Sequence, residues 1–502
     1  MTRLRFQLEG GVQALVFCVV LAMAFMSSHI QPWNLPAVRD VRWFALAELG
    51  VVALAVLLIR PRPQVLLLPH VLAGALLVAV ALGSAAWAAD SRVSAARAAS
   101  FGFLLLVGWA IAAGTRVRVE RVGGVVLAVL AAVTVIAAAG IVELWHSYDQ
   151  AVLPATIGRG ARYNGIGENP NQVAMLLALA IPLALWAYFE ARTRPAKVGV
   201  AVLALFLDGS LVASGSRGAI AAAFAGCTAF VLFALRRRRV VLVAVLAAAF
   251  GLNLLATQLP RQSKTNPELY QEFGSTPPLS RQDLNWRLPL ESELGFPGVN
   301  ATPTIRRKLV FSSGRRQAWE GAVRQAWDRP LLGYGFGMEE RAFVDRYYLF
   351  VSSRVENSFI STLLQLGPLG VALLVFVIGA ALRAWLLAAR KLPDDVARVA
   401  GACGAVVVAG VALAITQSYL TSVGNPVSPP FWIALFLLGA ISAEAGGSGG
   451  ERERDEREEH AAEGHREPRL DVVRGEDEGV RAEKDDGAAP GAPARERERG
   501  AR

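Results

Sequence analysis

The 502-residue sequence contains little charge, few histidines and few cysteines. Charged residues make up 18% of the chain, against about 25% in ordinary soluble domains. Hydrophobic residues make up 54%, and the mean hydropathy is +0.41. The three cysteines (Cys18, Cys227 and Cys403) lie in apolar runs, so no disulfide framework is predicted. The five histidines form no cluster with metal-ligand spacing, so we predict neither a metal nor a cofactor.

The charges that do occur are segregated along the chain. Residues 446–502 hold 12 Lys/Arg and 17 Asp/Glu, which leaves 39 Lys/Arg and 24 Asp/Glu in residues 1–445. The first segment is predicted to be a polytopic transmembrane domain, and the second a disordered, mixed-charge cytoplasmic tail. The basic residues of the body lie between apolar runs, which fits membrane topology and disfavours a nucleic-acid partner.

Apolar segments of about 20 residues are long enough to cross a bilayer as helices. The predicted class is therefore an all-α integral membrane protein with about 12 transmembrane helices. The candidate segments are residues 9–29, 43–59, 64–87, 98–113, 121–142, 171–189, 197–214, 217–235, 240–257, 357–382, 397–418 and 430–445.

Loop charges predict how these helices are oriented. With the N-terminus inside, the inner loops carry most of the arginines, including the run 236–239, and the short outer loops carry fewer. This pattern predicts a multi-pass protein of the cytoplasmic membrane with both termini cytoplasmic. It also makes the one long loop, at about 258–356, extracytoplasmic, with short helices in it. The sequence shows no repeat of the kind found in many transporters.

Five polar residues lie at the start of the sixth candidate helix, in the segment RYNGIGENPNQVA (162–174): Arg162, Asn164, Glu168, Asn169 and Asn171. Helix capping accounts for Asn169 and Pro170. It does not account for Arg162 and Glu168 at a membrane boundary, or for the further amide Asn171. We therefore take Arg162, Glu168 and Asn171 as candidate substrate-binding residues.

Arginines mark two further segments on the predicted outer side. The turn SGSRG (214–218) requires glycine and serine but not Arg217, which favours an anionic ligand for this side chain. The segment RRQAWEGAVRQAW (315–327) predicts an amphipathic helix on which Arg315 and Trp319 share a face, with Arg316 beside them. An interfacial helix anchored in the bilayer by tryptophan is the structural alternative. Arginine suits phosphate because it binds in a bidentate manner.

The segment VENSFISTLLQLGPLG (355–370) begins the tenth candidate helix, where Glu356 and Asn357 are placed to cap it. Taken in order, these motifs resemble the O-antigen ligase/polymerase family, which are bacterial membrane glycosyltransferases. The resemblance rests on R-x-x-G-x-x-x-N-P-N at 162–171, SGSRG at 214–218, S-G-R-x-x-x-W at 313–319, P-L-L-G-Y-G at 330–335, and E-N-S-F with G-P-L-G at 356–370. It spans residues 40–445, with 162–370 the informative part.

The resemblance implies transfer of a glycan from undecaprenyl diphosphate to an acceptor hydroxyl at the outer face of the membrane, without a metal and with inversion. The donor is then a polyprenyl-diphosphate-linked glycan, and the acceptor a lipid, a wall glycan or a saccharide. Arg217 and Arg315 would stabilise the departing diphosphate, and Glu356 would act on the acceptor hydroxyl. Trp319, Arg316 and Asn357 are further candidate substrate-binding residues. Members of the family often have histidine where this chain has Glu356, and residues 258–356 contain no histidine.

Two alternatives remain open at this stage. A polymerase would join lipid-linked repeat units by the same donor chemistry. A transporter of a small anion or lipid would use the outer arginines as an entry funnel, and it would favour ionisable groups near the membrane midplane, such as Asp208. The sequence leaves open whether Asp208 contacts another helix or lines a path.

Overall fold

The computed structural model describes most of the chain up to residue 443. The described residues are 2–30, 33, 35, 38, 41–59, 68–114, 119–153, 161–235, 239–257, 315–343 and 354–443. The predictions for residues 258–314 of the long loop, for the arginines at 236–238 and for the tail at 446–502 fall outside these ranges.

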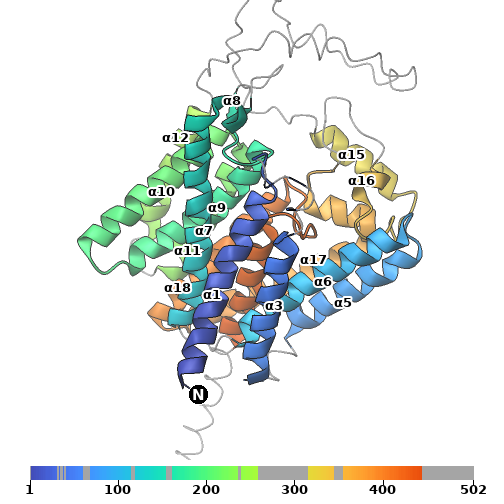
Figure 1. Cartoon of the computed structure of the whole chain (residues 1–502), viewed down its shortest axis with the longest axis horizontal. Helices are drawn as coiled ribbons and strands as arrows, with labels where there is room; N and C mark the ends of the chain where they lie inside the picture. Colours follow the sequence, from blue (N-terminus) through green and yellow to red (C-terminus); the bar gives the residue numbers. More distant parts are fainter. Residues whose placement is uncertain are drawn as a thin grey trace, which may run out of the picture. The chain divides into compact units, whose positions relative to one another are not determined.

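Helices make up almost all of the described structure (Figure 1). The long helices are α1 (Thr2–Phe25), α3 (Val41–Ile59), α5 (Pro69–Gly83), α6 (Ser91–Gly114), α7 (Val119–His146), α9 (Pro170–Glu190), α10 (Arg194–Ser214), α11 (Arg217–Ala234), α12 (Arg239–Ala256), α15 (Arg315–Ala326), α17 (Ser358–Ala388) and α18 (Asp394–Ala414), and a further helix runs over Ser428–Ala443. The short elements are η1 (Ser84–Ala86), α8 (Tyr148–Ala151), the antiparallel strands β1 (Val152–Leu153) and β2 (Arg162–Tyr163), and α16 (Glu339–Ala342).

Ten helices of the described part are long and apolar enough to cross a membrane. They correspond to ten of the twelve predicted segments. The first and last predicted segments coincide with shorter apolar helices, Gly10–Phe25 and Ser428–Ala443. The architecture is that of an all-α membrane protein, while the number of spans and their orientation stay predictions.

Small residues bring α11 and α18 into close contact at the centre of the bundle. A Cβ atom on Gly226 of α11 would lie 2.8 Å from the carbonyl oxygen of Ala405. On α18, a Cβ atom on Gly401 would lie 2.5 Å from the Cβ of Ala234. Such positions are typical of membrane helix interfaces, where close backbone approach replaces the hydrophobic driving force available in water. Helix α9 packs against both α11 and α18.

Helix α17 is kinked, and the kink receives the loop that follows α15. Gly367 has a φ of 67°, and Pro368 follows it. The N–H groups of Tyr334 and Gly335 donate to the carbonyl oxygens of Leu364 (3.0 Å) and Gln365 (2.9 Å), which the kink exposes. A Cβ atom on Gly333 would lie 2.6 Å from the Gln365 carbonyl, so glycine is required there. The motifs P-L-L-G-Y-G and G-P-L-G thus form one joint.

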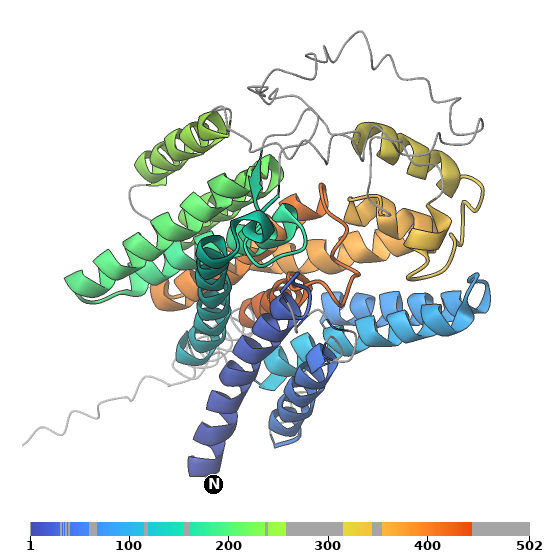
Figure 2. The same ribbon diagram turned by 45° about the horizontal axis from the view of Figure 1, so that its top comes forward.

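This joint fixes where α15 and α16 lie. Both pack on the first half of α17, at the end of the bundle opposite the start of α1 (Figures 1 and 2). The short helix α8 lies at this same end. The fold therefore gathers segments from three distant parts of the sequence at one end of the bundle.

Asp208, in the middle of α10, contacts another helix. Its Oδ1 accepts a hydrogen bond of 2.9 Å from the side-chain amide of Asn253 on α12. This contact gives the carboxyl group a structural partner within the bundle, which was one of the two possibilities left open by the sequence.

Candidate active site

Arg162 joins two of the sequence motifs. Its Nε donates to the carbonyl oxygen of Ser214 (2.7 Å), and its Nη2 donates to Oδ1 of Asn171 (2.7 Å). The residue is 8% exposed. Asn171 is the second residue of α9, whose N-cap is Asn169, as predicted from the sequence. Arg162 therefore ties β2 and the start of α9 to the end of α10, just before Arg217.

The turn at 214–218 places Arg217 at the first position of α11. Gly215 ends α10 with a φ of 64°, and a Cβ atom on Gly218 would lie 2.9 Å from Oγ1 of Thr416. Arg217 is partly buried and lies within electrostatic range of Arg315. Two guanidinium groups within range of each other in a partly buried place favour an anionic ligand.

Arg315 is paired with Glu356. Its Nε and Nη2 both donate to Oε2 of the carboxylate, at 2.7 and 2.5 Å. Glu356 is the one non-glycine residue with positive φ (52°) in the described chain, a strained conformation of the kind found at functional sites. Oε1 of Glu356 accepts no hydrogen bond from the residues that the structure describes.

The side chain of Asn357 caps α17 and contacts the end of α18. Its Oδ1 accepts hydrogen bonds of 3.0 Å from the N–H groups of Phe359 and Ile360, which is the N-cap predicted for this helix. Its side-chain amide donates to the carbonyl oxygen of Ile415 (2.9 Å). These bonds hold the start of α17 against the end of α18, next to Glu356.

The helix predicted at 315–327 is present as α15, and its Arg315–Trp319 face is turned inward. The indole N–H of Trp319 donates to the carbonyl oxygen of Val355 (3.0 Å), so this tryptophan contacts the protein and does not anchor the helix in the bilayer. Arg316 is exposed and pairs with Glu320 (2.9 Å) on the same helix. Arg315 and Trp319 thus reach adjacent residues of one segment, whereas Arg316 lies apart from them.

A polar cavity of about 420 Å³ lies beside Glu356. Three of the residues that line it, Glu168, Asn171 and Glu356, are among the candidates from the sequence. Its described lining includes neither Arg217 nor Arg315. The Glu356 carboxylate therefore pairs with Arg315 and also lines a cavity whose carboxylates and amides are suited to hydroxyl groups.

Residues 199–375 match the family model described as O-antigen ligase. This match supports the resemblance to the O-antigen ligase family that the sequence motifs indicate. The matched region runs from α10 into α17 and includes Arg217, Arg315, Trp319 and Glu356, while Arg162 precedes it. A search of curated proteins finds no match to this chain. The match and the apolar helices together support an enzyme of glycan transfer in cell-envelope polysaccharide synthesis and a multi-pass protein of the bacterial inner membrane.

The candidate site also includes a buried carboxyl group that sequence reasoning missed. Glu339 of α16 accepts hydrogen bonds from the N–H of Val355 (2.7 Å), from Ser361 (2.6 Å) and from Ser418 (3.2 Å). Burial raises the pKa of Glu339, and the hydrogen bonds and the charge of Arg354 oppose this only in part. Glu339 fixes the backbone next to Glu356.

An ion-pair network on the neighbouring residue was missed as well. Glu340 accepts from Nε of Arg354 (2.9 Å) and lies 3.6 Å from Nη2 of Arg97. Burial raises the pKa of Glu340, but Arg354 and Arg97 outweigh it, so its pKa lies below the ordinary value. The sequence signal for both residues was a pair of adjacent acids, Glu339 and Glu340, directly after the glycine-rich motif of a basic loop.

The described residues contain no group of three or more histidine, cysteine or acidic side chains that could hold a metal ion. The part of the chain that the structure describes therefore contains no candidate metal centre.

Proposed function

We propose that this protein is an O-antigen ligase-like enzyme that transfers a glycan from undecaprenyl diphosphate to an acceptor hydroxyl at the outer face of the cytoplasmic membrane. The observation that carries the proposal is the Arg315–Glu356 pair, with Arg217 alongside it and the polar cavity next to it. Cations suited to a leaving diphosphate and a carboxylate suited to a nucleophilic hydroxyl then stand side by side.

Arg217 and Arg315 bind the diphosphate of the donor. Breakage of the bond between the anomeric carbon and the phosphate oxygen develops negative charge on that oxygen. Guanidinium groups held in place before the reaction stabilise this charge without reorganisation. They supply the countercharge that a metal ion would supply in other transferases, so the proposed reaction is metal-independent.

Glu356 activates the acceptor. Because Arg315 binds the carboxylate through Oε2, an arriving diphosphate competes with Glu356 for the same guanidinium. Donor binding thus loosens the carboxylate at the moment when it is needed as a base. The acceptor oxygen attacks the anomeric carbon, its proton passes to Glu356, and the diphosphate leaves with the electron pair. A single displacement inverts the anomeric centre.

The remaining residues bind or position. Glu168 and Asn171, which line the polar cavity, are proposed to bind acceptor hydroxyl groups. Arg162 positions Asn171 and the turn that carries Arg217. Trp319 and Asn357 position the segment around Glu356.

The test is transfer by the purified protein in lipid vesicles. The donor is labelled polyprenyl-diphosphate glycan from the host, the acceptor is host envelope extract, and released polyprenyl diphosphate is measured with and without a chelator. Release that resists the chelator and is lost in Arg315→Ala supports the proposal. Absence of release, in a host shown to make such donors, contradicts it.

The same donor chemistry serves a ligase and a polymerase, and a deletion strain separates the two. Full-length glycans left on the lipid carrier indicate a ligase. A glycan ladder that collapses to single repeats indicates a polymerase.

A further inference from the structure

The backbone of Glu356 is held on both sides. Its φ of 52° depends on the orientation of the two peptide groups that flank it, one shared with Val355 and one shared with Asn357. The carbonyl oxygen of Val355 accepts a hydrogen bond of 3.0 Å from the indole N–H of Trp319. The N–H of Asn357 donates a hydrogen bond of 3.0 Å to Oγ of Ser418. Neither peptide group can therefore rotate to relieve the positive φ without breaking a hydrogen bond.

A single carboxyl group, that of Glu339, connects the residues on the two sides of Glu356. Its Oε1 accepts a hydrogen bond of 2.7 Å from the N–H of Val355 and one of 3.2 Å from the hydroxyl group of Ser418. The Ser418 hydroxyl thus donates to Glu339 while it accepts from Asn357. Glu339 therefore determines the direction in which this hydroxyl group presents its lone pairs to the Asn357 N–H.

The two oxygens of Glu339 have different partners. Oε2 accepts a hydrogen bond of 2.6 Å from the hydroxyl group of Ser361, which in turn accepts from the side-chain amide of Gln365 (2.8 Å), one turn further along α17. The Oε1 bonds lead to the neighbours of Glu356, and the Oε2 bond leads along α17. Ser418 and Ser361 therefore form a matched pair, because each donates to the same carboxyl group but the Ser418 side chain alone of the two binds the N–H of Asn357.

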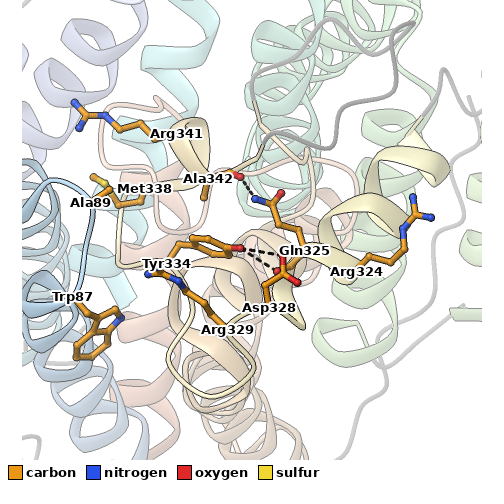
Figure 3. Close-up of a pocket in the computed structure, with 10 residues that line it drawn as sticks. All are labelled: Trp87, Ala89, Arg324, Gln325, Asp328, Arg329, Tyr334, Met338, Arg341 and Ala342. Carbon is orange, nitrogen blue, oxygen red and sulfur yellow. Dashed lines mark hydrogen bonds between the residues drawn. The ribbon is translucent and has the colours of Figure 1, made fainter. Parts of the chain in front are cut away.

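Glu339 is itself fixed in place, because α16 is bound to two other parts of the fold. The side-chain amide of Gln325 on α15 donates to the carbonyl oxygen of Ala342 (Figure 3). Arg341 pairs with Asp90, which directly precedes α6, at 2.8 Å. Glu339 is 7% exposed, and it is absent from the described lining of the polar cavity. Its side chain therefore acts on Glu356 through the backbone, without lining the cavity itself.

We propose that Glu339, acting through Val355 and Ser418, is a positioning residue that holds Glu356 in the backbone conformation from which its carboxylate reaches both Arg315 and the polar cavity. The consequence for catalysis rests on the proposed function, in which Glu356 takes the proton of the acceptor hydroxyl. Without the Oε1 acceptor, residue 356 relaxes toward negative φ and the carboxylate leaves its position. The transfer rate then falls, whereas the arginines that bind the diphosphate stay in place.

The role requires a hydrogen-bond acceptor at Oε1 of Glu339 and does not require a charge. Glu339→Gln keeps an oxygen that can accept from Val355 and Ser418, and Glu339→Leu removes it. Ser418→Ala removes only the link to Asn357. Ser361→Ala is the matched control, because it removes a hydrogen bond to the same carboxyl group from the Oε2 side.

The first part of the test measures polyprenyl diphosphate release in vesicles, and the affinity of the same purified proteins for undecaprenyl diphosphate. Because Ser418 also lines the polar cavity, rates are taken at saturating envelope extract. Glu339→Leu and Ser418→Ala should lower the rate about tenfold or more, without weaker diphosphate binding. Glu339→Gln and Ser361→Ala should stay within about threefold of the native rate. Equal rates for Ser418→Ala and Ser361→Ala, or a loss of diphosphate affinity that parallels the loss of rate, would overturn the proposal.

The second part measures thermal unfolding and needs no transfer, so it separates this inference from the proposed function. Glu356→Gly relieves the strain of a positive φ and Glu356→Ala keeps it, so Glu356→Gly should unfold at a midpoint about 1–2 °C higher. This difference should vanish when Glu339→Leu or Ser418→Ala is added, and it should persist with Ser361→Ala. If Glu339→Leu does not fold, Ser418→Ala decides.

The outcomes of the two parts are distinguishable. A midpoint difference that is the same in every background, or absent from the native background, would overturn the positioning role even in a protein that transfers glycan. The expected midpoint differences in a protein that releases no polyprenyl diphosphate would contradict the proposed function while supporting the positioning role of Glu339.

Discussion

Replacing Arg315 with lysine keeps a positive charge near Arg217 but removes the planar guanidinium group, whose N–H donors point in fixed directions. In the native pair, two nitrogens of Arg315 converge on one carboxylate oxygen at 2.7 and 2.5 Å. When the diphosphate displaces Glu356, the same planar donors can bind two phosphate oxygens at once. Lysine presents its donors from a single atom on a flexible chain and cannot bind the diphosphate in that bidentate geometry.

The size of the effect follows from the bonds that are lost. A hydrogen bond to a charged group contributes about 1.5–3 kcal/mol, which corresponds to a rate about 10- to 150-fold lower if the bond acts in the transition state. Arg315→Ala loses the charge as well and should fall further. Because lysine can still pair with Glu356, the thermal midpoint of Arg315→Lys should stay close to that of the native protein.

The assay is polyprenyl diphosphate release in vesicles, with thermal unfolding in detergent as the control for folding. A lysine variant that works within about threefold of the native rate, while Arg315→Ala is inactive, would show that charge alone suffices. That result would refute the proposed bidentate role of Arg315.

Three further predictions concern residues around the site. Asn357→Ala should lower the free energy of unfolding by about 1–2 kcal/mol, because it removes the N-cap of α17 and the hydrogen bond to the carbonyl oxygen of Ile415. Thermal unfolding measures this change, and an unchanged midpoint would contradict the capping role. Because the pKa of Glu339 is raised in the folded state, the free energy of unfolding should fall as pH rises from the ordinary pKa of 4.5 through the raised pKa. Glu339→Gln should flatten this dependence of the thermal midpoint on pH. Identical profiles of midpoint against pH for the two proteins would contradict the prediction. Gly333→Ala should destabilise the contact between the loop after α15 and the kink of α17, and so raise the rate of proteolysis in residues 315–343. Gly199→Ala, at a position on α10 with open space around it, should leave that rate unchanged. Equal proteolysis rates in the two variants would contradict the close packing at residue 333.

The helices could be predicted from sequence because bilayer thickness fixes their length and composition, and their capping residues have local signatures. Asn169 and Asn357 are N-caps where the sequence places them. The convergence of Arg217, Arg315 and Glu356 was predictable only through the order of motifs in a known family, since the residues come from three separate elements. The role of Trp319 was left open because hydrophobic periodicity does not say which partner a buried indole contacts.

Other parts of the site had no sequence signal that reasoning could use. Glu339 lies in a four-residue helix, and its burial depends on Ser361 and Ser418, which arrive from two other segments. The position of the loop after α15 depends on the kink at Gly367, whose exposed carbonyl groups bind that loop. Both features arise from long-range packing, which local residue patterns do not encode.

The affinity of the purified protein for undecaprenyl diphosphate tests the shared role of the two arginines most directly, because binding requires no acceptor and no chemistry. Arg217→Ala and Arg315→Ala should each weaken binding about tenfold or more, whereas Arg194→Ala, at an exposed arginine at the start of α10, should not. Glu356→Gln should bind more tightly than the native protein and yet transfer no glycan, because it frees Arg315 and removes the base. Unchanged affinity in both arginine variants, or weaker binding by Glu356→Gln, would contradict a diphosphate site at Arg217 and Arg315.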